Sequence, residues 1–247
     1  MNGKARREER KTNFVLAGGQ SIKRLTFWPP RAAVVGVVDS SEALVASRRA
    51  AGRCCDFLEW RADRMGVEMP DSKLPWIITA RHPAEGGFGG LSEIRRRKIL
   101  LELLRRATCV DVEVRSLDGM AEVLHEARSR GVRIIASFHD FKKTPSVAEI
   151  LKKIRSAKER GADIAKVATL TSRPADLVKL LEVLEKSPLP LSIMGMGRLG
   201  MASRVLFSSC GSVLNYGWLN SASVSGQWSV HQLRGMLDAM ASGKDRR

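Results

Sequence analysis

Eight apolar segments that alternate with amphipathic segments constrain the fold of this chain more than any other feature of its sequence. The apolar segments, each of a length typical of a buried strand, lie at 31–40, 54–63, 74–81, 109–114, 132–138, 163–170, 189–194 and 212–217. Helical patterns lie at 41–52, 91–107, 118–130, 146–160, 174–186, 200–208 and 229–241. Only the second and third strands lack a full helix between them, and the helix at 91–107 carries apolar residues at Ile94, Leu101 and Leu104.

Continuous apolar strands separated by helices predict a parallel sheet that is covered on both faces. Eight such units within 247 residues match the number that closes a (β/α)8 TIM barrel, and a doubly wound sheet is the main alternative. The sequence shows no linker or internal repeat that would divide it. We therefore expect an α/β barrel domain at 31–241, a basic and flexible N-terminal extension at 1–30, and a short polar tail at 242–247.

The net charge of +16 is compatible with nucleic acid, an anionic membrane or an anionic small molecule as the partner. Most of the excess lies in helical segments such as 93–106 and 149–160, between the apolar positions, which favours solvated helix faces. Aromatic residues make up 5% of the chain and are not interleaved with the basic runs, so a stacking surface for nucleic acid is disfavoured. We expect no nucleic-acid partner.

No apolar run approaches the roughly 18–20 residues that cross a bilayer, and the polar start of the chain lacks the apolar stretch of a secretory signal. We therefore expect a cytoplasmic protein without a membrane partner. The cysteines Cys54, Cys55, Cys109 and Cys210 form no C-x-x-C motif and have no partner at zinc spacing, which predicts no metal site. We expect the adjacent Cys54 and Cys55 to be small core residues.

A G-x-G-x-x-G motif at Gly195, Gly197 and Gly200 follows an apolar strand and precedes a helix, as a dinucleotide fingerprint does. Such a fingerprint requires an acidic residue about 20 positions further on, to bind the ribose. The chain has no Asp or Glu between Ser187 and Leu237. The motif therefore predicts a tight turn that brings Arg204 to the pocket, and we expect no NAD or other cofactor.

Two residues near strand ends indicate chemistry, because the active sites of TIM barrels lie at the C-terminal ends of the strands. Lys166 interrupts the apolar run 163–170, where a lysine is rare without a partner or a purpose. Burial and nearby cations such as Arg81 and Arg204 would keep part of its amine neutral and able to attack a ketone. His139 ends the preceding strand and is suited to proton transfer near neutral pH. A snorkelling lysine and a structural histidine are the alternatives.

Short motifs in order along the chain support a family assignment. They are EWRAD at 59–63, TARHPAEGG at 79–87, SFHDF at 137–141, AKVAT at 165–169, M-x-M-G at 194–197, SR at 203–204 and SASVSGQ at 221–227. Together they make the chain resemble type I 3-dehydroquinate dehydratase, the Schiff-base-forming 3-dehydroquinase of the shikimate pathway. The resemblance extends from about residue 31 to residue 241.

The resemblance implies a role for each matching residue and needs no metal or cofactor. Lys166 would form an imine with the ketone of 3-dehydroquinate, His139 would act as general base and then general acid, and Glu85 would orient His139. Arg204 would bind the substrate carboxylate, which suits a bidentate guanidinium. The remaining substrate-binding residues would be Ser223 and Gln227 on a closing loop, Glu59, Arg61 and Arg81 at the ring hydroxyls, and Met194 and Met196 along the pocket.

The closing loop departs from the family pattern, because Ser225 stands where proline usually precedes the glycine. The family resemblance also implies a homodimer. Two other functions stay open at this point. Another lysine-dependent barrel of the aldolase type would make or break a carbon–carbon bond, and a basic nucleic-acid-binding protein would bind with steep salt dependence.

Overall fold

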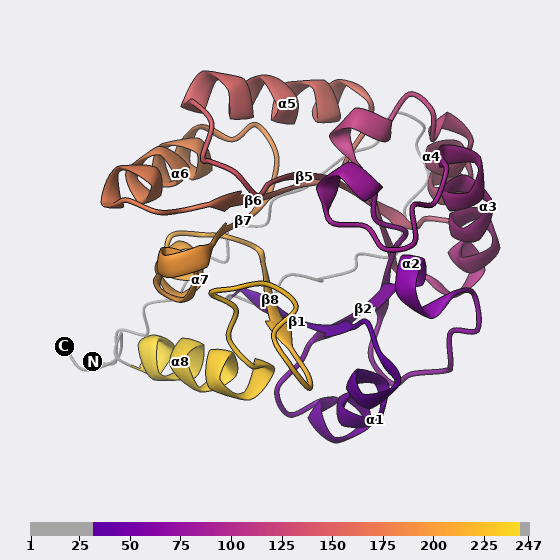
Figure 1. Ribbon diagram of the computed structural model, residues 1–247, viewed down its shortest axis with the longest axis horizontal. Coiled ribbons are helices and arrows are strands. Elements are labelled where there is room, and N and C mark those ends of the chain that lie inside the picture. The colour runs from indigo at the N-terminus through magenta and orange to yellow at the C-terminus, as the bar shows by residue number, and fades with distance from the viewer. Residues whose placement is uncertain (1–31, 243–247) are drawn as a thin grey trace, which may run out of the picture.

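Eight parallel strands form the centre of the molecule and the helices surround them in a ring (Figure 1). The computed structural model describes residues 32–242, so the predicted N-terminal extension at 1–30 and residues 243–247 of the predicted tail lie outside the described residues. The strands are β1 (Ala33–Val38), β2 (Phe57–Arg61), β3 (Trp76–Thr79), β4 (Cys109–Glu113), β5 (Arg133–Asp140), β6 (Ile164–Leu170), β7 (Leu191–Met196) and β8 (Leu214–Trp218).

Hydrogen-bonded neighbours follow the order β7-β6-β5-β4-β3-β2-β1-β8, and each of these pairs is parallel. The two ends of this sheet meet, because the Val213 amide donates to the Leu191 carbonyl at 3.0 Å. The Ser192 hydroxyl donates across the same seam to the Leu214 carbonyl at 2.8 Å. The predicted (β/α)8 barrel is therefore confirmed and the doubly wound sheet is excluded.

The described helices are α1 (Ser41–Ala50), α2 (Ala62–Met65), α3 (Glu93–Leu103), α4 (Ala121–Ser129), α5 (Val147–Glu159), α6 (Pro174–Lys186), α7 (Gly200–Ser209) and α8 (Val230–Ser242). Local sequence fixes several of their starts. Ser40 caps α1 by accepting from the Ala43 amide at 3.1 Å, and Ser146 forms a capping box with Glu149 at the start of α5. As predicted, only a single helical turn, α2, lies between β2 and β3.

Element boundaries differ from the sequence-based expectation by a few residues, with one larger difference in α3. The predicted helix 91–107 ends at Leu103 and continues as the 3₁₀ turn η2 (Leu104–Arg106). Its buried face includes Arg96 and Leu100, whereas Ile94 is 70% exposed. The apolar pattern alone misplaced this face, because the Arg96 side chain points inward and pairs with the carboxylate of Glu113 at the end of β4.

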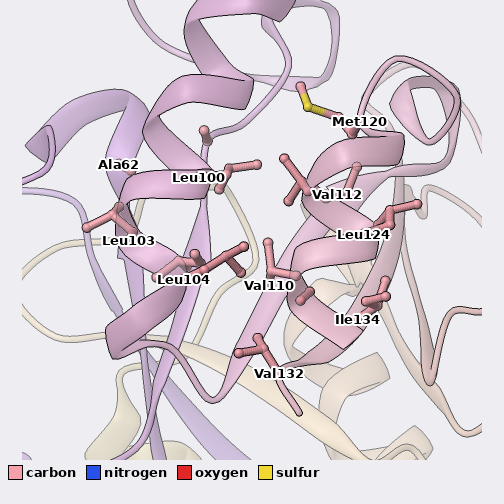
Figure 2. Packing of buried hydrophobic residues seen from close by; sticks show 14 of the residues in the cluster. Ala62, Leu100, Leu103, Leu104, Val110, Val112, Met120, Leu124, Val132 and Ile134 are labelled. Carbon is pink, nitrogen blue, oxygen red and sulfur yellow. The ribbon is translucent and has the colours of Figure 1, made fainter. Parts of the chain in front are cut away.

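Apolar side chains fill two layers around the strands. The outer layer lies between strands and helices, and Figure 2 shows part of it, with Leu100 of α3 and Leu104 of η2 facing Val110 and Val112 of β4. The inner layer lies inside the barrel and includes Val35, Met194, Met196 and Tyr216, among others. This packing fixes the strands from both sides, so their C-terminal ends form a rigid frame for polar groups.

The positions of the cysteines, the character of the helices and the grouping of possible metal ligands can be compared with the sequence-based expectations. Cys54 and Cys55 are 8% and 3% exposed and lie directly before β2, which confirms them as core residues. Cys109 is also buried, Cys210 is exposed, and all four thiols are free. Within residues 32–242, no helix combines the length and apolar character needed to cross a membrane. In the same range, no group of three or more His, Cys, Asp or Glu side chains is placed to hold a metal ion.

Candidate active site

Charged side chains enter the barrel from several strands because alternate residues of a strand point to the same side. Asp111 and Glu113 on β4 are both buried and lie two residues apart. Glu59 on β2 and Lys166 on β6 join them, and both are at most 4% exposed. Charged residues are rarely this buried unless they are paired, so the contacts among them determine what the site can do.

Lys166 lies at the centre of this cluster. Its Nζ donates to Asp111 Oδ2 at 2.9 Å and to Glu59 Oε1 at 3.2 Å. The sequence-based expectation placed arginines near this amine and did not include the two carboxylates that contact it directly. The same Nζ lies 3.8 Å from the ring centroid of Tyr216 on β8.

Arg81 follows β3 and binds the same carboxylates from the neighbouring position. Its guanidinium donates to Asp111 at 3.2 Å and 3.3 Å, to Glu113 at 3.2 Å and to the Ser137 hydroxyl at 2.7 Å. Burial alone would lower the pKa of Arg81, but the charges of Asp111 and Glu113 outweigh it and raise that pKa. Arg81 is therefore a fixed cation that holds both β4 carboxylates in place.

His139 stands at the end of β5 and contacts the carboxylate of Glu85. Glu85 lies in the 3₁₀ turn η1 (Pro83–Glu85), and its Oε2 accepts from the His139 backbone amide at 2.9 Å. The same oxygen lies 3.0 Å from His139 Nδ1. Arg81 Nη1 lies 3.3 Å from the same nitrogen. In the tautomer that carries its proton on Nδ1, an ionised Glu85 accepts from Nδ1–H and the lone pair is on Nε2 of the imidazole.

The protonation of this pair follows from its surroundings. Burial, followed by the charges of Arg81 and Lys166, holds the pKa of His139 well below its usual value. Burial and the charge of Glu113 raise the pKa of Glu85 to about 7. The imidazole is thus neutral at neutral pH and able to accept a proton, which is the state that a general base requires.

Arg61, at the end of β2, has a carboxylate partner of its own. Its Nε and Nη2 donate to the two oxygens of Asp63 at 2.9 Å and 2.8 Å, and Nη2 also lies 3.2 Å from the Gly86 carbonyl. Asp63 in turn accepts from the backbone amide of Phe88 at 2.9 Å. This bidentate pair ties the EWRAD segment to the loop that carries Glu85.

Arg204 on α7 has different surroundings. Its Nη1 donates to the carbonyls of Gly195, Gly200 and Gly226 at 2.8, 3.0 and 2.7 Å, and its Nε donates to the carbonyl of Tyr216 at 3.3 Å. Within the described residues it pairs with no carboxylate and its Nη2 has no hydrogen bond. Burial lowers the pKa of Arg204 to about 10. The predicted turn at the glycines does bring Arg204 to the barrel mouth.

The loop between β8 and α8 docks against the same turn. Gly197 and Gly226 both have positive φ, of 74° and 79°, and a Cβ on Gly226 would lie 2.2 Å from the Gly197 carbonyl oxygen. The Gly197 amide donates to the Ser225 carbonyl at 2.8 Å. A Cβ on Gly200 would in turn lie 2.7 Å from the Gly226 carbonyl oxygen, so the two backbones can approach this closely because residues 200 and 226 are glycine.

The remaining predicted residues lie on this loop and in the inner layer. The Ser223 hydroxyl donates to Asp39 Oδ2 at 2.7 Å, so it binds the end of β1, and the Ser223 amide lies 3.3 Å from the Gln227 side-chain oxygen. Met194 and Met196 of β7 are 3% and 4% exposed, inside the barrel. The structure thus places the predicted residues of β2 to β6 at the same end of the barrel as those of β7, α7 and the loop between β8 and α8.

Sequence reasoning missed several members of the cluster. They are Asp63, Asp111, Glu113, Ser137 and Tyr216. A signal was present for the two β4 carboxylates, because residues 109–114 read C-V-D-V-E-V and the acidic residues alternate with valines in a buried strand. Ser137 and His139 share a strand face for the same reason. Only the fold shows that these faces meet.

Ionisable groups at the C-terminal ends of barrel strands are typical of the (β/α)8 barrel enzymes, which defines the class of this protein. Comparison with known proteins narrows the class to one family. Residues 32–244 match the family model of type I 3-dehydroquinase, so the chain belongs to that family. The 3-dehydroquinate dehydratase of Enterococcus faecalis is 32% identical over 238 residues, which cover 87% of this chain and 94% of the relative.

Other relatives agree with this assignment. The 3-dehydroquinate dehydratase of Methanosarcina acetivorans is 31% identical and covers 85% of this chain and 95% of its own length. Among solved structures, type I 3-dehydroquinate dehydratase from Clostridium difficile superposes with a TM-score of 0.76 at 26% identity, covering 86% of this chain and 94% of that chain. The match extends over the whole barrel.

Proposed function

We propose that this chain is a hydro-lyase that converts 3-dehydroquinate to 3-dehydroshikimate and water, a step of the shikimate pathway toward chorismate and the aromatic amino acids. Membership of the type I 3-dehydroquinase family supports the reaction. The observation that carries the mechanism is a buried lysine, Lys166, on the strand next to His139. A primary amine and a neutral imidazole are the two groups that dehydration through an imine requires.

In the proposed reaction, the neutral amine of Lys166 attacks the ketone carbon, and the ketone oxygen leaves as water to give a protonated imine. His139 then removes a proton from the adjacent carbon, and the electron pair moves toward the imine nitrogen to form an enamine. The electrons return to expel the hydroxyl one carbon further on, which takes its proton from His139 and leaves as water. Hydrolysis of the imine releases the conjugated product and restores Lys166. The imine serves as the electron sink, so the reaction needs no metal or cofactor.

Arg204 is proposed to bind the carboxylate of the substrate. A buried cation without a counter-ion is costly unless a ligand supplies one. The geometry supports this role, since four carbonyls hold Nη1 and Nε while Nη2 has no protein partner among the described residues. The carbonyl of Gly226 is one of the four, so the same guanidinium would link carboxylate binding to the position of the closing loop.

The other roles remain proposals taken from the family resemblance. Glu85 would orient His139, and the contact of 3.0 Å between Glu85 Oε2 and His139 Nδ1 supports this. The other assigned contacts to the substrate are those of Ser223 and Gln227 from the closing loop, of Glu59, Arg61 and Arg81 at the ring hydroxyls, and of Met194 and Met196 along the pocket wall.

Trapping the imine with borohydride tests the proposed function. Wild-type protein incubated with 3-dehydroquinate and borohydride should lose activity irreversibly, and peptide mapping should place one adduct on Lys166. Lys166→Ala should show neither adduct nor turnover. His139→Ala is the matched control, because it should still form the adduct while turnover falls by about 10²–10⁴-fold, the usual contribution of general acid–base catalysis.

The product distinguishes the proposed reaction from its nearest alternative. Dehydration yields a conjugated enone that absorbs in the ultraviolet, whereas an aldolase-type reaction would cleave the carbon skeleton. Full turnover in the presence of borohydride with no adduct on any lysine would refute the Schiff-base mechanism. We also propose, from the family resemblance, a cytoplasmic homodimer, and light scattering of the purified chain would detect a monomer if that assignment is wrong.

A further inference from the structure

Tyr216 is the one aromatic side chain in the described chain found against the amine of Lys166, and the mechanism above does not use it. It lies on β8 inside the barrel and is 3% exposed. Its ring centroid is 3.8 Å from Lys166 Nζ, which places the amine over the face of the ring. Cations within about 6 Å of an aromatic face are attracted to it, most strongly where water is excluded.

The hydroxyl of Tyr216 does not explain why the side chain is there. Its Oη is buried and has no hydrogen-bond partner within the described residues. Buried phenols usually have such a partner, and an unpaired hydroxyl costs stability. Burial, followed by the charges of Glu59 and Asp111, raises the pKa of Tyr216 well above its usual value, so the phenol stays neutral. The ring is therefore the part that interacts productively.

We propose that the ring of Tyr216 is a positioning residue that stabilises the positive charge on Lys166 Nζ in the protonated imine. This inference rests on the proposed Schiff-base function. A neutral amine has two N–H donors, enough for the bonds that Lys166 Nζ makes to Asp111 at 2.9 Å and to Glu59 at 3.2 Å. The protonated imine has a single N–H and can keep only one such bond.

The ring face differs from the carboxylates because it needs no N–H donor. Its attraction acts on the charge that arises when the neutral amine, the ketone and a proton combine to form the protonated imine and release water. It ends when the substrate loses its α-proton, since the enamine nitrogen is neutral. The ring therefore shifts the equilibrium toward the protonated imine, relative to both the free amine and the enamine.

The test compares Tyr216→Leu, which removes the ring, with Tyr216→Phe, which keeps it. Both are made in a His139→Ala background, where dehydration is slowed and the imine accumulates. The readout is the substrate concentration at which half of Lys166 is trapped by borohydride. Tyr216→Leu should raise it about tenfold to thirtyfold, which corresponds to about 1.4–2 kcal/mol for a desolvated cation–π contact. Tyr216→Phe should keep this concentration within a few-fold of its value in the His139→Ala background.

Phe207→Leu is the control for lost aromatic volume, because Phe207 is fully buried but lies in the cluster outside the strands. It should leave trapping at the background level while lowering the melting temperature. If Tyr216→Leu does not fold, Tyr216→Met takes its place. Equal trapping with and without the ring, or an equal loss in Tyr216→Phe, would overturn the role of the ring. Absence of an adduct in the wild-type chain would instead refute the Schiff-base function itself.

Discussion

Arg81 and Arg204 are both about 96% buried, yet the protein treats their charges in opposite ways. Arg81 contacts the carboxylates of Asp111 and Glu113, and these charges raise its pKa despite burial. Arg204 contacts backbone carbonyls, and burial lowers its pKa to about 10. One side of the barrel mouth is therefore balanced in charge, and the other has a positive charge that no described residue neutralises.

The sequence explains the difference. Acidic residues occur on β2 and β4, where they face into the barrel. From Ser187 to Leu237, a stretch that includes β7, α7 and β8, the chain contains no Asp or Glu. The same absence that excluded a dinucleotide fingerprint leaves Arg204 without a counter-ion from its own part of the chain, and no other residue within 32–242 supplies one. A site for an anionic substrate requires such an imbalance, because a carboxylate already present would compete with the ligand.

The largest expected effect tests the balanced side. Asp111→Asn keeps the shape of the side chain and removes its charge, so Lys166 and Arg81 lose a shared carboxylate. Breaking a buried ion pair on one side costs about 3–5 kcal/mol of unfolding free energy. Urea denaturation followed by circular dichroism would measure the loss.

A surface pair provides the control for this substitution. Asp118→Asn removes a carboxylate of the exposed pair with Arg160, where the Asp118 side chain is 82% exposed. Exposed pairs contribute about 0–1 kcal/mol. Equal stability losses for Asp111→Asn and Asp118→Asn would show that the buried cluster is not the charge-balanced unit described here.

The next effect tests the unbalanced side and concerns binding. Arg204→Lys keeps the charge but loses the planar fork, so a carboxylate can no longer be bound in a bidentate way. The KM for 3-dehydroquinate should rise by about ten- to a hundredfold, as expected for the loss of about 1.5–3 kcal/mol in hydrogen bonds to a charged group. Steady-state kinetics would measure it, with Arg198→Lys on the same segment as control. An unaltered KM would mean that another residue binds the carboxylate.

The two sides also differ in how far the sequence predicts them. Periodicity placed the strands and helices. Their order placed Lys166 inside a strand, His139 at a strand end and Arg204 after the glycine turn, since these are local patterns. The motifs of the family supplied roles for those residues. The partners of Lys166 were not predicted, because a carboxylate at position 111 belongs to a strand far from 166 in the chain. Such contacts depend on barrel closure and register.

Two further contacts show the same limit. Arg96 has the sequence context of a solvated helix residue, yet it is 1% exposed because it pairs with Glu113 across the layer. Ser223 is proposed to contact the substrate, and the sequence did not predict that its hydroxyl also donates to Asp39, which lies 184 residues earlier in the chain. A helical pattern in the sequence predicts only that one face of a helix is buried. Whether a charged residue on that helix is also buried depends on a partner that the tertiary structure supplies.

The smallest expected effect is on the pH dependence of the unfolding free energy, and it concerns His139 on the balanced side. His139 has its pKa lowered well below 6.5, mainly by burial and then by Arg81 and Lys166. A depressed pKa contributes stability that is present above the unfolded-state value and is lost as the pH falls below it. Glu85, with its pKa raised to about 7, acts in the opposite sense, because its contribution to stability is lost as the pH rises.

The comparison is therefore made in a Glu85→Gln background, with and without His139→Gln. Between about pH 7.5 and about pH 5.5, the chain that retains His139 should lose about 1.4 kcal/mol more unfolding free energy, since one pH unit below the unfolded-state pKa is worth that amount. Urea titrations at both pH values would measure the difference, and equal losses in the two chains would show that the folded protein does not hold His139 neutral.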